Sequence, residues 1–145
     1  MRFMMLLKAG KNSESGAMPD DKLLNAMGKY NEEMVKAGVL LDGEGLHPSS
    51  KGARVRFSGG KPTVTDGPFT EAKELIAGFW MIQVKSKEEA IEWASRCPDP
   101  QVDDGGSFEI ELRQVIEASE FPQDNEAVRK EVELRAQSEK LKKGS

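Results

Sequence analysis

The order of hydrophobic patterns along the chain limits its fold more than any other feature of the sequence. Two segments have apolar residues at helical spacing, and each lies between two short segments with the apolar or alternating character of β-strands. Two strand–helix–strand units predict an α+β domain with ferredoxin-like topology, in which a four-stranded antiparallel sheet carries both helices on one face. The predicted strands are 2–9, 39–41, 78–84 and 108–115, and the predicted helices are 22–36 and 86–97.

A small β-hairpin is predicted between the two units. Residues 54–57 alternate polar and apolar side chains, Gly59-Gly60 is a turn signal, and residues 62–65 form the returning strand. The face of the sheet opposite the helices is left bare in this arrangement. An apolar bare face usually packs against a two-fold copy of itself, so we expect a homodimer.

The ends of the helices carry capping signals. Asp20 or Asp21 offers an N-cap for the first helix, and Gly38 stands where a glycine usually ends one. Ser86 followed by Glu89 predicts a capping box at the start of the second helix.

Length and composition describe one soluble domain and exclude several classes of function. The chain has 145 residues and a net charge of −4, which argues against a nucleic-acid partner. No apolar run approaches the roughly 18 residues of a membrane span, and the first run is too short for a signal peptide, so a cytoplasmic location is expected. Cys97, the single cysteine, excludes an internal disulfide and is read as a small buried side chain. We expect no metal and no other cofactor.

The last part of the chain differs from the rest. We expect a domain at residues 1–116 and a charged extension at 117–145. Residues 124–143 are mostly charged, and Glu131 with Arg135 is a favourable helical pair. Because the apolar positions are few, this segment is read as a marginal helix, which a protein partner could engage.

The segment TDGPFTEAKE, residues 65–74, has two interpretations. In the structural one, Asp66 caps a strand-to-helix corner, Pro68 occupies the first helical turn and Phe69 anchors the corner in the core. In the functional one, Asp66 with nearby glutamates supplies a base or ligands for a hard cation, and Lys73 holds an anionic substrate. Local physics favours the structural interpretation.

Four further residues are candidates for a binding or catalytic site. His47 titrates near neutral pH and could act with Asp66 in acid–base catalysis, although a histidine in a glycine-rich loop is more often a solvated surface residue. Arg54 and Arg56 share a strand face and could bind an anion, or could simply be solvated. Trp80 fills the core or lines a pocket.

Several segments together resemble the DGPF proteins of the YCII-related domain family. They are AGVLLDGEGLHP, VTDGPFTEAKE, GFWMIQV and EEAIEWASRCP, and the resemblance covers about residues 1–116. It implies a ferredoxin-like fold that dimerises into an α+β barrel, as in muconolactone-isomerase-like enzymes. It also implies an acid–base role for a histidine and an aspartate in a cleft, although most members have no assigned reaction. Some members are associated with alternative sigma factors.

One departure from the family pattern concerns the mechanism. The histidine of the enzyme-like members lies on the first helix, and residues 22–36 contain none here. Asp66 matches the motif aspartate, whereas His47 is not an obvious equivalent. Two functions therefore remain: a homodimer that binds a small molecule beside the motif, with Asp66, His47, Arg54, Lys73, Phe69 and Trp80 at the site, or a non-catalytic regulatory or interaction module.

Overall fold

Four strands form an antiparallel sheet with the topology that the sequence predicts. The computed structural model describes residues 1–100 and 106–143. The strands are β1 (Arg2–Lys8), β2 (Leu40–Gly45), β5 (Ile76–Gln83) and β6 (Ile110–Gln114), and they lie in the order β2-β5-β1-β6. Because the two central strands are the first strands of the two units, this order is the ferredoxin-like arrangement of an α+β domain.

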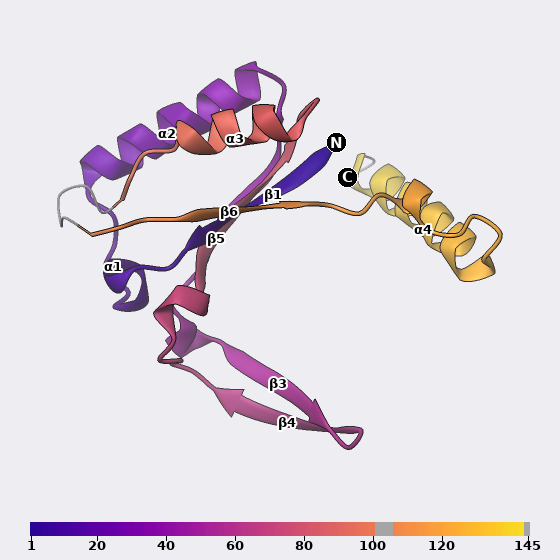
Figure 1. Cartoon of the computed structure of the whole chain (residues 1–145), viewed down its shortest axis with the longest axis horizontal. Helices are drawn as coiled ribbons and strands as arrows, with labels where there is room; N and C mark the ends of the chain where they lie inside the picture. Colours follow the sequence, from indigo (N-terminus) through magenta and orange to yellow (C-terminus); the bar gives the residue numbers. More distant parts are fainter. Residues whose placement is uncertain (101–105, 144–145) are drawn as a thin grey trace. The chain divides into compact units, whose positions relative to one another are not determined.

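Two helices, α2 (Asp21–Lys36) and α3 (Lys87–Ser95), lie on the same face of this sheet (Figure 1). The Asp20 carboxylate caps α2 by accepting a hydrogen bond from the backbone of the third helical residue. The Ser86 hydroxyl caps α3, but the Glu89 carboxylate accepts from the amide of Lys85 instead of the amide of Ser86. A four-residue helix, α1 (Lys11–Glu14), lies between β1 and α2.

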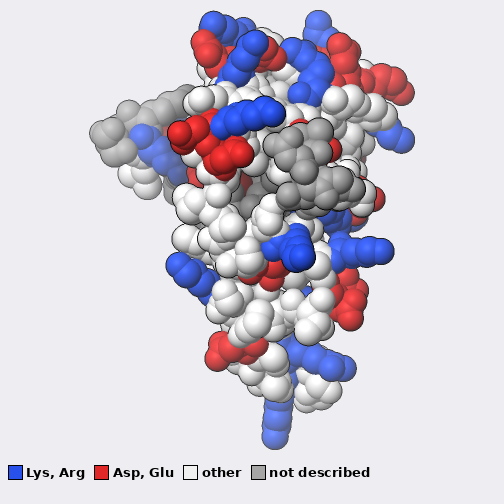
Figure 2. All heavy atoms as spheres, turned by 90° about the vertical axis from the view of Figure 1, so that its left-hand side faces the viewer, with Lys and Arg blue, Asp and Glu red and all other residues white. Residues whose placement is uncertain are grey.

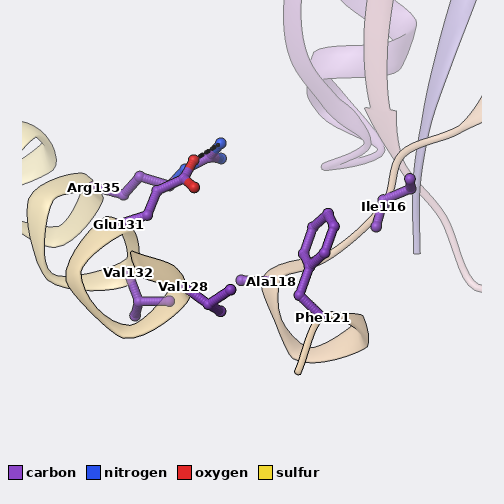
Figure 3. A pocket seen from close by; sticks show the side chains of 7 residues that line it. All are labelled: Ile116, Ala118, Phe121, Val128, Glu131, Val132 and Arg135. Carbon is purple, nitrogen blue, oxygen red and sulfur yellow. Dashed lines mark hydrogen bonds and ion pairs between the residues drawn. The ribbon is translucent and has the colours of Figure 1, made fainter. Parts of the chain in front are cut away.

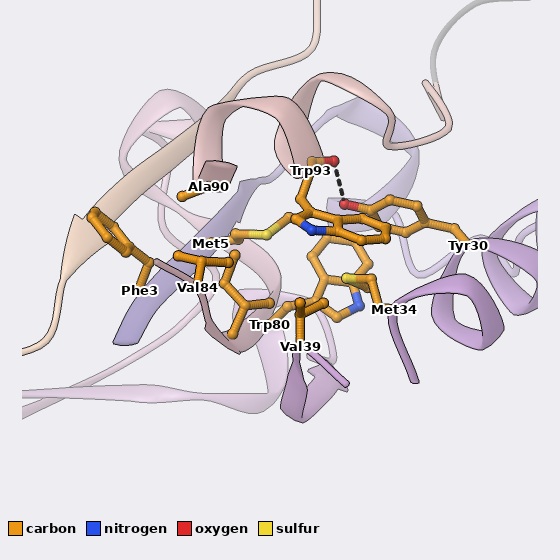
Figure 4. Close-up of a cluster of buried hydrophobic side chains, with 10 residues drawn as sticks. Phe3, Met5, Tyr30, Met34, Val39, Trp80, Val84, Ala90 and Trp93 are labelled. Atoms are coloured by element: carbon orange, nitrogen blue, oxygen red, sulfur yellow. Dashed lines mark hydrogen bonds between the residues drawn. The ribbon is translucent and has the colours of Figure 1, made fainter. Parts of the chain in front are cut away.

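The core lies between the helices and the sheet (Figure 4). Met5, Met34 and Ile82 are fully buried, one each from β1, α2 and β5. The Tyr30 hydroxyl donates a 2.7 Å hydrogen bond to the Trp93 carbonyl, which joins α2 to α3 inside the core. The other buried apolar side chains are Phe3, Val39, Trp80, Val84, Ala90 and Trp93.

The opposite face of the sheet has an apolar centre, which we call the open face. Met4 pairs with Met81 and Leu6 with Phe79 across β1 and β5, and all four side chains are partly exposed. Charged residues of the edge strands border this centre: Asp42, Glu44, Glu111 and Arg113. Acidic and basic side chains are likewise interspersed on the surface that Figure 2 shows.

The predicted hairpin forms a separate two-stranded sheet of β3 (Ala53–Ser58) and β4 (Lys61–Asp66). Gly59 and Gly60 have positive φ angles of 60° and 80°, which suits a two-residue turn. The ribbon extends away from the four-stranded sheet (Figure 1), and every residue of both strands is exposed.

The chain divides into two compact units, residues 1–114 and 115–145. The second contains a helical turn, Ala118–Glu120, and the helix α4 (Glu126–Lys143), in which Glu131 and Arg135 form the expected ion pair. Within this unit a hollow of about 180 Å³ lies between α4 and the segment before it (Figure 3). In the described part of the chain, no helix has the length and apolar character needed to cross a membrane.

Candidate functional site

The DGPF segment folds as a corner, but not as the sequence predicts. No α-helix follows Pro68; a single 3₁₀ turn at Ala72–Glu74 takes its place, and the Gly67–Pro68 peptide bond is cis. The amide of Phe69 donates to the Ser49 hydroxyl at 3.0 Å. A serine from another loop therefore performs the capping role expected of Asp66.

Ser49 connects this corner to α1. Its amide donates to one carboxylate oxygen of Glu14 at 3.0 Å, and its hydroxyl donates to the other at 2.6 Å. Gly67 packs directly on the Ser49 peptide, because a Cβ atom at position 67 would overlap with the Ser49 carbonyl oxygen. The corner, the loop after β2 and α1 are thus held together by backbone contact and hydrogen bonds.

The predicted site residues in and near the motif lie on the exposed side of this corner. The Arg54 guanidinium lies 3.9 Å from the centre of the Phe69 ring, which is a cation–π contact. Asp66 and Lys73 are exposed, and neither side chain makes a hydrogen bond or ion pair within the described residues. Gly67 and Phe69 of the motif therefore have structural roles: Gly67 allows close backbone packing, and Phe69 contacts Ser49 and Arg54.

The first unit contains an open cleft of about 950 Å³, which we call the α2 cleft. Its floor is the helix-facing side of β2 and β5, where three glycines, Gly43, Gly45 and Gly78, lie near one another because Gly45 pairs with Gly78 in the sheet. Gly45 leaves space open at this floor, because a Cβ atom added there would meet no atom within 4 Å, whereas the Trp80 indole covers Gly43 and the Glu44 backbone lies against Gly78. The wall on the helix side includes Leu23 and Met27.

Asn31 brings a polar group into this apolar wall. Its side-chain oxygen accepts a 2.8 Å hydrogen bond from the indole nitrogen of Trp80, and both residues line the cleft. Lys22 and His47 line it at exposed positions, and their side chains make no hydrogen bond or ion pair with the described residues. The α2 cleft therefore combines an apolar interior with a few polar groups, as small-molecule sites do.

The structure separates the predicted site residues into two places. His47 and Trp80 line the α2 cleft, whereas Asp66, Arg54, Phe69 and Lys73 lie at the DGPF corner and do not line it. The cleft residues that sequence reasoning missed include Asn31 and the three glycines. Asn31 could have been found as a polar residue in the helical row of Leu23 and Met27, since residues four apart share a face.

Two titratable groups of the core are held in their neutral forms. Burial raises the pKa of the Cys97 thiol to about 12, and the nearby Asp99 carboxylate adds to the effect. Burial also raises the pKa of Tyr30 well above its usual value. Because the thiolate is the nucleophilic form of cysteine, this shift disfavours the reactive form of Cys97. No group of three or more potential metal ligands is found among residues 1–100 and 106–143.

This chain belongs to the YCII-related domain family, whose model matches residues 1–119. An uncharacterized protein, R00369 of Rhizobium meliloti (strain 1021), is 30% identical over 103 residues, which cover 71% of this chain and 82% of that protein. Among solved structures, the 5-chloro-2-hydroxyhydroquinone dehydrochlorinase TftG from Burkholderia phenoliruptrix AC1100, in complex with 2,5-dihydroxybenzoquinone, has 15% identity and a TM-score of 0.45. The match covers 84% of this chain and all of TftG.

Proposed function

We propose that this YCII-related domain binds a small organic molecule in the α2 cleft. The observation that carries the proposal is the cleft itself, a preformed space that Gly45 leaves open at the floor under α2. The cleft volume of about 950 Å³ lies within the usual range of ligand pockets, about 300–1,000 Å³. The DGPF corner supports the site indirectly. Gly67 and Phe69 contact Ser49, and Ser49 is only two residues along the chain from His47, which lines the cleft.

Cofactor-free acid–base chemistry of the isomerase or lyase type is the enzymatic form of this proposal. His47 is the candidate acid or base, because it lines the cleft and an imidazole can both accept and donate a proton. Asp66 does not line the cleft, so this form of the proposal assigns the chemistry to His47 without Asp66. A reaction in the cleft would then be lost in His47→Gln while ligand affinity remains.

Filling the cleft tests the binding function. A side chain at Gly45 meets no atom within 4 Å of its Cβ position, so Gly45→Leu occupies the empty space without a clash at the backbone. We expect this variant to fold and to lose binding of small aromatic and polar compounds that shift the wild-type melting temperature. The matched control is Gly28→Ala, which also meets no neighbour and lies on exposed α2 outside the cleft. Equal binding by wild type and Gly45→Leu would contradict the proposal.

The open face supports the proposal that the protein is a homodimer. Met4, Leu6, Phe79 and Met81 form a contiguous apolar centre that a second copy can cover. Leu6→Lys places a charge in that centre, next to Glu111, with which Leu6 is paired, so the protomer itself tolerates the change. We expect the wild type to sediment as a dimer and Leu6→Lys as a folded monomer. A monomeric wild type at micromolar concentration would refute this arrangement.

The C-terminal unit favours a second candidate function, a non-catalytic regulatory or interaction module. Three of its apolar side chains, Ile116, Leu134 and Leu141, are 63%, 52% and 77% exposed. In this case the cleft binds its ligand without changing it, and residues 117–145 engage a protein. Recovery of chemically unchanged ligand after incubation, together with loss of a partner on truncation after Phe121, would favour this function over catalysis.

A further inference from the structure

We infer that the α2 cleft selects planar aromatic molecules that carry a carbonyl-type oxygen, and that the side-chain amide of Asn31 is the group that recognises this oxygen. The inference rests on the proposed function, because it assigns a ligand class to the same cleft. Three features carry it: the orientation of the Asn31 amide, the rigid layer behind it, and the flat floor in front of it.

The orientation of the Asn31 amide follows from its partner. An indole nitrogen only donates hydrogen bonds, so the atom that faces Trp80 at 2.8 Å must be the Asn31 oxygen. The amide nitrogen therefore points elsewhere, and it makes no hydrogen bond with the described residues. It is also accessible, because no buried side-chain nitrogen or oxygen lacks a partner in the described part of the chain. Since Asn31 lines the cleft, this nitrogen offers its two hydrogens to an acceptor there.

The layer behind Asn31 fixes this donor in place. Trp80 is 8% exposed and packs edge-to-face against the Tyr30 ring, with 5.5 Å between ring centres. Tyr30 is anchored in turn by its hydroxyl bond to the Trp93 carbonyl. A donor that is held by a packed aromatic pair loses little conformational entropy on binding, which favours affinity.

The shape of the cleft limits the rest of the ligand. On the floor, Gly45 presents only backbone with open space beside it, and the Trp80 indole covers Gly43, so a flat ring can lie against the Gly45 backbone next to the indole. Leu23 and Met27 precede Asn31 at four-residue intervals on α2 and provide an apolar wall. A ligand that matches both surfaces has an aromatic body and an acceptor at the end beside Asn31.

The other open polar groups of the cleft contribute less to this selection. Lys22 and His47 are exposed, whereas Asn31 is partly buried beside the core. Water competes more strongly for exposed groups, so a hydrogen bond to the Asn31 amide carries more of the discrimination between ligands.

A pair of nearly isosteric probes tests the inference. Acetophenone has a carbonyl oxygen, and α-methylstyrene has a methylene group in the same position. Binding is followed by the NMR signals of the Asn31 amide and the Trp80 indole in ¹⁵N-labelled protein. The Trp93 indole is an internal control, because Trp93 does not line the cleft.

Asn31→Asp is the decisive variant, because the carboxylate keeps an acceptor for Trp80 but replaces the donor with a second acceptor. We expect it to weaken acetophenone binding by at least about 3- to 10-fold, the value of one hydrogen bond, and to leave α-methylstyrene binding within about twofold. Asn31→Gln keeps the amide group but moves it by one methylene, so it tests whether the position of the donor matters. Chemical shifts of the core verify the fold of each variant.

The outcomes separate this inference from the proposed function. If both probes bind the wild type but Asn31→Asp affects them equally or not at all, the role of Asn31 is overturned while ligand binding in the cleft stands. If neither probe binds, the assigned ligand class is overturned, and the Gly45→Leu comparison with other compounds decides the proposed function independently.

Discussion

Replacing Gly67 by alanine tests whether backbone contact at the DGPF corner stabilises the domain. The added methyl group would overlap with the Ser49 carbonyl oxygen and lie 2.6 Å from the carbonyl carbon, so the two segments must separate. Forced packing costs about 1–3 kcal/mol. Separation also weakens two hydrogen bonds, from Phe69 to Ser49 and from Gly67 to Gly52, each worth about 1 kcal/mol. The expected loss is therefore about 3–5 kcal/mol of unfolding free energy.

Urea unfolding followed by tryptophan fluorescence measures this loss, since Trp80 and Trp93 both lie in the core. Gly52→Ala is the matched control, because a Cβ atom there would lie 3.5 Å from the same Ser49 oxygen, which is ordinary contact. We expect the control to remain within about 1 kcal/mol of wild type. A Gly67→Ala protein as stable as Gly52→Ala would refute the argument that this glycine is required for packing.

Three further predictions use the same unfolding assay. Ser49→Ala removes the hydroxyl of two hydrogen bonds and should cost about 2–3 kcal/mol; a loss below about 0.5 kcal/mol would show that water replaces it. Tyr30→Phe removes the buried bond to the Trp93 carbonyl and should cost about 1–2 kcal/mol, with an unchanged value counting against that bond. The pKa of Cys97 is raised to about 12 from 9.0, so its thiol ionises more easily after unfolding, and stability should fall as the pH rises from 9.0 toward 12. Cys97→Ala should lessen this fall, and identical pH profiles would contradict the shift.

Most of the fold could be predicted from the sequence because its signals are local. Asp20 and Ser86 cap the two helices as expected, and Gly38 ends the first with a φ angle of 74°. The Gly59-Gly60 turn produced the predicted hairpin. Each of these features depends on residues within a few positions along the chain, so a single sequence contains the necessary information.

The DGPF corner shows where local reasoning fails. Asp66 is a good helix cap by residue type, but Phe69 donates instead to Ser49, a residue 20 positions earlier. Ser49 becomes the partner because the chain returns through the hairpin and brings Phe69 next to it. A cap supplied from so far away leaves no pattern around the motif itself, so the expected helix after Pro68 was wrong.

The cleft could not be located from the sequence for a similar reason. Gly45 and Gly78 become neighbours only through the pairing of β2 with β5, and nothing in the sequence around either residue indicates the other. Asn31 was within reach of sequence reasoning, since it interrupts an apolar row on α2. Its partner Trp80 is 49 positions away, and only the folded chain brings them together.

The β3–β4 ribbon has a consequence for how this protein tolerates change. Its strands pair only with each other among the described residues, and the amide of Gly67 bonds to the Gly52 carbonyl at its base. An isolated pair of strands is marginal in water, so its amides should exchange with deuterium far faster than those of β1 and β5. The tip at Gly59-Gly60 is consequently the place where a peptide tag or a fluorescent label can be inserted with little effect on the core.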